Sequence, residues 1–149
     1  MRQLILSIIF ILLPVMASGF VLDGLQNNDT LKECLAKSDA VIVVYVSQPL
    51  ERIAEADNEV YLLNLNTGEL LYKNDRLPLN LIPREKEVLQ FVLKKENAAS
   101  LSKGDKLILF LKVEYSKLPY YSFSDERFGI QKYTDALAAS INGIYQEKE

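Results

Sequence analysis

The densest group of side chains suited to acid–base chemistry is Asp125-Glu126-Arg127, within a stretch rich in aromatic residues. Two carboxylates can share the roles of general acid and general base if burial raises the pKa of one of them. Adjacent residues in a loop usually point apart, and an arginine beside them is typical of a solvated turn. A small secreted hydrolase that uses Asp125 or Glu126 is therefore an alternative hypothesis, and not the leading one.

The residue types missing from the sequence exclude other chemistry. It has no histidine and one cysteine, Cys34. A Ser-His-Asp or Cys-His nucleophile and a zinc site of His and Cys ligands are thereby excluded. Cys34 falls in a predicted amphipathic helical turn beside Leu31 and Leu35, which favours a buried thiol over an intermolecular disulfide. We expect no catalytic residue, no metal and no cofactor.

A cluster of aromatic side chains is the best candidate for a binding surface. Six of the 14 aromatic residues fall within residues 115–133. Tyrosine-rich loops on a rigid scaffold provide contact area at low entropic cost. Pro119 favours an extended backbone before Tyr120, so we assign partner binding to Tyr120, Tyr121 and Phe123. The alternative is that these rings pack the loop onto the core, as we expect of Phe128 and Tyr133.

Composition indicates one ordinary globular domain. The sequence has 149 residues, is 49% hydrophobic and 25% charged, and carries a net charge of −3. Nucleic-acid binding depends largely on neutralising phosphates, and an acidic chain without a basic block is poorly suited to it. We therefore expect a partner that is another protein or an envelope component, and no nucleic acid.

The N-terminus has the three-part pattern of a secretory signal peptide. Arg2 gives a positive start, residues 4–13 are apolar except for Ser7, and small residues precede a cleavage site after Ala17. The apolar stretch is shorter than the ~20 residues of a membrane-spanning helix, so cleavage is favoured over anchoring. We expect a signal peptide over 1–17, one mature domain over 18–149 with no membrane span, and a periplasmic or extracellular location. A cut after Gly19 is the alternative.

Hydrophobic patterns and turn residues outline the elements that must position these side chains. The expected helices span residues 31–37, with a Thr30–Glu33 capping box, and the C-terminal residues after a Thr134 cap. Leu137, Ile141, Ile144 and Tyr145 would share one face of the second helix. The expected strands are 40–46, 60–65 and 69–73 joined at Asn66-Thr67-Gly68, and 107–113 after a turn at 102–105. Residues 84–95 fit a helix or a strand, with a strand favoured.

These elements predict a mainly β fold. About five strands, two of them apolar on both faces, suit a small closed barrel partly covered by helices. We expect a five-stranded Greek-key barrel of the OB type with a short N-terminal helix and a C-terminal helix. A flat open α+β sheet is the alternative.

Three segments carry a resemblance to a known family: LKECLAKSDAVIVVYV (31–46), LSKGDKLILFL (101–111) and FSDERFGIQKYTDALAASI (123–141). They resemble secreted bacterial proteins that look like the OB-fold domain of the tissue inhibitors of metalloproteinases. In the animal inhibitors an N-terminal cysteine chelates the target's zinc and disulfides brace the domain. The expected mature terminus here is Ser18 or Phe20, and Cys34 is the only cysteine, so that mechanism cannot be carried over. The resemblance implies a fold and a compartment.

The leading expectation is an exported, non-enzymatic β-barrel that binds another macromolecule through residues 115–128. A protein inhibitor and an envelope accessory protein are the roles considered. Besides the hydrolase, a solute-binding module with a cavity inside the barrel is an alternative.

Overall fold

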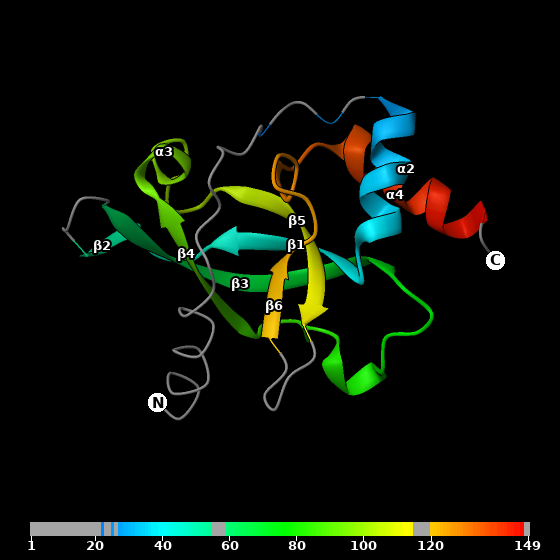
Figure 1. Ribbon diagram of the computed structural model, residues 1–149, viewed down its shortest axis with the longest axis horizontal. Helices are drawn as coiled ribbons and strands as arrows, with labels where there is room; N and C mark the ends of the chain where they lie inside the picture. Colours follow the sequence, from blue (N-terminus) through cyan, green and yellow to red (C-terminus); the bar gives the residue numbers. More distant parts are fainter. Residues whose placement is uncertain (1–21, 23–24, 26, 55–58, 115–119, 148–149) are drawn as a thin grey trace.

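The computed structural model describes residues 22, 25, 27–54, 59–114 and 120–147 (Figure 1). The predicted signal peptide and part of the aromatic stretch, residues 115–119, lie outside them. The described elements are α2 (Asn28–Lys37), β1 (Ala40–Val46), β2 (Glu51–Ala54), β3 (Val60–Lys73), the 3-10 helix η1 (Leu79–Leu81), β4 (Val88–Lys94), α3 (Lys95–Ala98), β5 (Lys106–Glu114), β6 (Tyr120–Phe123), β7 (Ile130–Lys132) and α4 (Asp135–Glu147). None of the helices in this part of the chain has the length and hydropathy needed to cross a membrane.

The fold is mainly β, a curled antiparallel sheet that forms a half-barrel, with helices α2 and α4 packed together beside it (Figure 1). The sheet has seven strands in the described residues, so the expected count of five is wrong. The seven nevertheless occupy five positions across the sheet. Residues 60–62 of β3 pair with β2 and with β4, and residues 65 and 66 pair with β1 and with β4. Since a strand has two edges, β1 and β2 follow one another along the same edge of β3.

The same reasoning places β6 and β7 in tandem along one edge of β5. Residues 107–109 pair with β1 and β7, and Leu111 pairs with β1 and β6. The order across the sheet is therefore β4, β3, β1 with β2, β5, and β6 with β7. At the two ends of this order, the rings of Phe91 in β4 and Phe123 in β6 lie 4.7 Å apart. The half-barrel thus brings side chains of its two outermost strands together.

Strand β1 is buried on both faces, as its uninterrupted apolar sequence predicts. Ile42, Val44 and Val46 point into the half-barrel, where they pack with inward-facing side chains of the other strands, among them Leu63, Leu65, Leu89, Phe91, Leu107 and Leu109. Val41 and Val43 point the other way, into a second core under α2 and α4. The β5 residues divide in the same manner, with Ile108 and Phe110 under the helices.

The predicted hairpin at Asn66-Thr67-Gly68 is wrong, because these residues continue a single 14-residue strand, β3. The register against β1 shifts twice: Val41 and Ile42 face Tyr72 and Leu70, and Val44 faces Thr67. Each shift adds a residue to β3, as in a β-bulge, and bulges bend a strand. The glycine therefore serves a bend and not a turn.

The sequence at Gly68 also reflects close packing. A Cβ atom there would lie 3.2 Å from Cε1 of Tyr45 and 3.2 Å from the carbonyl oxygen of Val43. The absent side chain lets the Tyr45 ring lie close to the strand. Sequence reasoning detected the glycine but could not distinguish this contact from a turn.

The predicted buried face of α4 is confirmed, but only one of the two predicted helix N-caps is. Helix α2 starts at Asn28 because Oδ1 of Asn27 accepts hydrogen bonds from the amides of Asp29 and Thr30, at 2.8 and 3.3 Å. The predicted Thr30 cap is therefore wrong. In α4 the predicted cap is confirmed, with Oγ1 of Thr134 accepting from the Leu137 amide at 3.1 Å. The four residues predicted on one face of α4 all pack against the second core: Leu137, Ile141, Ile144 and Tyr145.

Two further strands are confirmed, whereas the segment expected to be an aromatic loop contains strands. The favoured strand in 84–95 is confirmed as β4, although α3 then follows it without a break. The 102–105 turn and the strand after it are also confirmed, with Gly104 at a positive φ of 92°. The expected aromatic loop instead contains β6 and β7, two short strands paired with β5.

Gly129 and Gly143 predict opposite effects of the same substitution. A Cβ at Gly129 would lie 2.7 Å from the Asp125 carbonyl oxygen and 2.7 Å from Cβ of Phe123, whereas Gly143 in α4 has nothing within 4 Å. We expect Gly129→Ala to lower the free energy of unfolding by about 2 kcal/mol through overpacking. Gly143→Ala should raise it by roughly 0.5–1 kcal/mol, since alanine is the better helix former. Urea unfolding checks both values, and a neutral Gly129→Ala would contradict the packing described here.

Candidate functional site

The three aromatic residues predicted to bind a partner lie on strand β6. Tyr121 and Phe123 point inward: both pack against the half-barrel core, and the hydroxyl of Tyr121 donates to the carbonyl oxygen of Leu81 at 2.8 Å. Burial, with the Glu87 carboxylate adding to it, raises the pKa of Tyr121 to about 12. Both side chains therefore contribute to packing, which is the alternative that the sequence left open.

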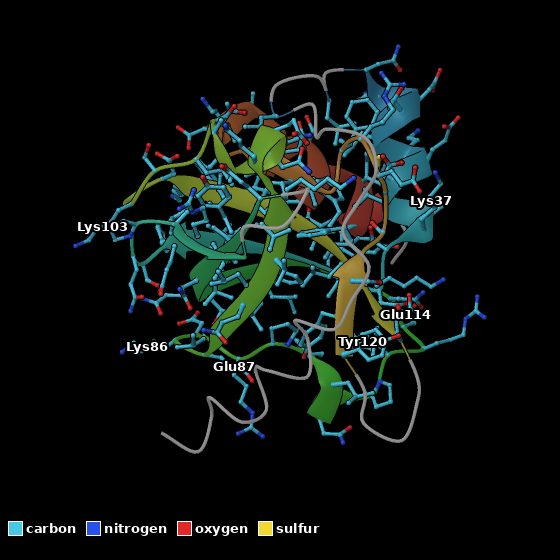
Figure 2. All side chains as sticks on the ribbon, turned by 60° about the vertical axis from the view of Figure 1, so that its left-hand side comes forward. Lys37, Lys86, Glu87, Lys103, Glu114 and Tyr120 are labelled. Atoms are coloured by element: carbon cyan, nitrogen blue, oxygen red, sulfur yellow. The ribbon has the colours of Figure 1, made fainter. Side chains whose placement is uncertain are left out.

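Tyr120 lies on the other face of β6, because successive residues of a strand alternate. It is half-buried and pairs with Glu114, beside which it is seen in Figure 2. The three residues do not share one face, so a contact surface made of all three would require the strand to turn over. The assignment of partner binding to this strand stays a prediction. Phe128 and Tyr133 pack against the helix-covered core, as expected.

The predicted acidic pair separates into a partnered and an exposed carboxylate. Oδ1 of Asp125 accepts hydrogen bonds from the amides of Arg127 and Phe128, at 2.8 and 2.9 Å, and its Oδ2 lies 3.2 Å from Nζ of Lys37. Partial burial alone would raise its pKa, but these two amides and the ammonium lower it overall. Glu126 is exposed. A general acid needs a raised pKa, so the lowered value at Asp125 gives the hydrolase hypothesis no support.

Asp125 joins a polar connection between α2 and the segment before β7. The Ser38 hydroxyl donates to the Cys34 carbonyl oxygen at 2.7 Å and lies 2.7 Å from the Ser124 hydroxyl. The Cys34 side chain is 1% exposed, and its burial, with Asp125 nearby, raises the pKa of the thiol to about 11. The predicted buried thiol is confirmed, and a protonated thiol is a poor nucleophile. These contacts fix α2 to the sheet.

A groove at one end of the half-barrel was not predicted. It has a volume of about 560 Å³, is open to solvent, and lies between the segment leading into β2, the start of β3, helix α3 and the turn before β5. Its lining residues are Pro49, Leu50, Tyr61, Lys95, Ala98, Ala99, Leu101, Ser102 and Lys103. This volume is in the range of ligand-binding clefts. The residues come from four separate segments, and no local pattern in the sequence connects them.

The floor of this groove is the end of the barrel core. Ala98 and Leu101 belong to the core inside the half-barrel, and Leu50 and Tyr61 pack against it. The Tyr61 hydroxyl donates to Oε2 of Glu59 at 3.1 Å, so the ring is held at its polar end as well as by packing. A floor built in this way is apolar and fixed in shape.

The rim of the groove carries positive charge in an acidic protein. Two of the nine lining residues are lysines, and none is acidic. Lys103 extends from the body of the molecule at the opposite side from Lys37 (Figure 2). Lys95 contacts Glu59 at 3.7 Å, with its side chain 65% exposed. The groove therefore combines an apolar base with cations at its edge.

A second hollow, of about 480 Å³, lies over the bulged part of β3 and the segment before β4. Its lining residues are Tyr45, Asn66, Thr67, Gly68, Glu69, Glu85 and Lys86. Two acids and one lysine leave it without a dominant charge, and its base is polar. In the described residues, no group of three or more cysteine or acidic side chains is placed to hold a metal ion.

Neutralising Asp125 should weaken the connection between α2 and the sheet. The lowered pKa means that this carboxylate stabilises the fold above its unfolded pKa and loses that effect as the pH falls through the folded value. The side-chain oxygen that Asp125→Asn retains could still accept both amides, so this substitution isolates the charge. We expect a loss of about 1 kcal/mol at pH 7 and a shallower decline of stability below pH ~4. Denaturant titrations measure this, with exposed Glu126→Gln as the control; equal effects of the two variants would contradict the assignment.

Comparisons with known proteins add no functional assignment. Neither a protein-family model nor a curated protein matches this chain. Any function must therefore be argued from the groove, the strand β6 and the polar connection described above.

Proposed function

We propose that this chain is an exported binding module, an OB-type barrel that holds another protein or an envelope component and performs no chemistry on it. The observation that carries the proposal is the groove at the end of the half-barrel, with its apolar floor and lysine rim. Binding sites combine a rigid apolar centre with a few polar groups that fix orientation. The groove has both.

The order of the sheet supports the OB-type barrel. Five positions across a curled antiparallel sheet, with the outermost two in contact through Phe91 and Phe123, fit a small and partly open Greek-key barrel. Tandem strands in two of the positions account for the count of seven. The signal-peptide pattern in the sequence supports export, to the periplasm or beyond. Because a fold of this kind hosts many functions, the groove and not the barrel must carry the assignment.

The other hypotheses receive less support from the geometry. The hydrolase lacks a carboxylate of raised pKa at Asp125. The interior that a solute cavity would occupy is filled by the core side chains of the half-barrel. The metalloproteinase-inhibitor mechanism needs a terminal cysteine, and Cys34 is buried within α2. A role as inhibitor by another route, or as an envelope accessory protein, is compatible with the proposal.

Ala99 and Ser100 provide a matched pair for testing the groove. Both are exposed and adjacent, but only Ala99 lines the groove. The tagged chain would be recovered after export, its N-terminus checked by intact mass for a start at Ser18 or Phe20, and used to capture partners from the native envelope fraction. We expect a partner retained by the unmodified chain and by Ser100→Trp, and reduced about tenfold by Ala99→Trp, which fills the groove.

Tyr120→Ala distinguishes the groove from the aromatic strand in the same experiment. A partner lost with Tyr120→Ala and kept with Ala99→Trp would place the contact on β6 and overturn the groove assignment. Identical capture by all four proteins would contradict both surfaces.

A further inference from the structure

We propose that the groove receives an extended acidic segment of a partner protein, anchored by one apolar side chain. This inference rests on the proposed binding function and specifies the chemistry of its ligand. It follows from three features of the described residues: the origin of the floor, the size of the residues at its edge, and the state of the charges around it.

The floor is suited to an apolar anchor. Leu101 is 6% exposed and Ala98 7% exposed, and both belong to the continuous core of the half-barrel. An incoming side chain would therefore meet atoms already held in place, without ordering a flexible surface first. Contacts of that kind dominate binding energy at protein interfaces, where a few anchors fill preformed pockets.

The edge is suited to a close approach of the partner's backbone. The small residues Ala99 and Ser102 line it, and the long side chains beside them are the rim lysines, Lys95 and Lys103. The groove is also open to solvent, and an enclosed small-molecule pocket would instead bury most of its ligand. A protein segment, with only its anchor buried, is the occupant that this shape favours.

The charges around the groove favour carboxylates on that segment. Two acids beside the rim are already engaged: Glu59 accepts from Tyr61 and lies 3.3 Å from Arg52, and Asp105 accepts from the Ser102 amide at 2.8 Å. The exposed Glu51 and Glu96 neighbour Leu50 and Lys95 in the chain but do not line the groove. The Tyr61 hydrogen bond, with Lys95 and Arg52 nearby, lowers the pKa of Glu59 and keeps it ionised.

Lys103 takes part in none of the ion pairs found within the described residues. A carboxylate of the ligand can therefore pair with it without displacing an existing bond. A ligand cation would find no acidic lining residue and would face Lys103 and Lys95. The second hollow, with Glu69 and Glu85 in its lining, lacks this preference.

The probe that tests this is a short peptide, blocked at both ends, with one leucine between two glutamates on each side. Companion peptides carry glutamines or lysines in place of the glutamates, or alanine in place of the leucine. The isotopically labelled exported chain would be titrated with each, and backbone amide shifts would report both the site and the affinity. We expect the shifts to concentrate at residues 95–103.

The expected pattern separates the anchor from the charge. The glutamine peptide should bind about fivefold more weakly at low salt, and about 0.5 M salt should remove that difference. The alanine peptide should bind at least about tenfold more weakly, from the lost burial of a leucine side chain. Lys103→Glu should weaken the glutamate peptide about fivefold, whereas Lys32→Glu, the same change on the exposed face of α2, should not.

The outcomes distinguish this inference from the function on which it rests. If the glutamine and lysine peptides bind as tightly as the acidic one, and Ala99→Trp blocks all three, the groove binds peptides and the acidic specificity is overturned. If the shifts survive Ala99→Trp as they survive Ser100→Trp, the groove is not the site and both proposals fall. The absence of any shift overturns the acidic segment alone, and envelope capture then decides the function.

Discussion

The burial of β1 on both faces is the constraint on which the rest of the structure depends. Its seven residues are almost wholly apolar, so each face must be covered by a separate layer. The inner layer forms when the sheet curls and packs against Ile42, Val44 and Val46. The outer layer consists of α2 and α4 over Val41 and Val43. The two cores, the curl of the sheet and the position of both helices follow from this one strand.

Each layer then produces a different surface feature. The inner core is open at the end where α3 lies, and the exposed end of that core is the floor of the groove. The outer core must hold α2 against the sheet, and the Ser38, Ser124 and Asp125 contacts do this at the helix end. The groove is thus a consequence of how the sheet curls, while the acidic pair belongs to the attachment of a helix. Judged by residue type alone, the acidic pair would have been the stronger candidate for a functional site and the groove the weaker.

The parts of the fold that the sequence predicts correctly are those with a strong local pattern. Strands β1 and β5, the face of α4 and the turn at Gly104 each have a periodicity or turn residue that points one way. The hairpin predicted at Thr67-Gly68 was wrong because a glycine between two apolar runs fits a hairpin, a bulge or a close ring contact equally well. Only the position of the Tyr45 ring distinguishes them. The inward orientation of Tyr121 and Phe123 could not be predicted, because the alternation that turns them inward applies only once residues 120–123 are known to be a strand. The groove residues share no pattern at all, since the fold alone brings Leu50, Tyr61 and Leu101 together.

The burial of Cys34 has a consequence for the order of events after synthesis. A thiol that is 1% exposed in the folded chain is accessible in the unfolded one. Under the proposed export to an oxidising compartment, the interval between translocation and docking of α2 is then the main period in which two copies could be cross-linked by oxidation. That docking requires contacts between residues far apart in the sequence, such as Ser38 with Ser124, and contacts of this kind form slowly. Under that proposal, slow docking of α2 lengthens the exposure of the thiol, and the rate of folding affects the yield of monomer.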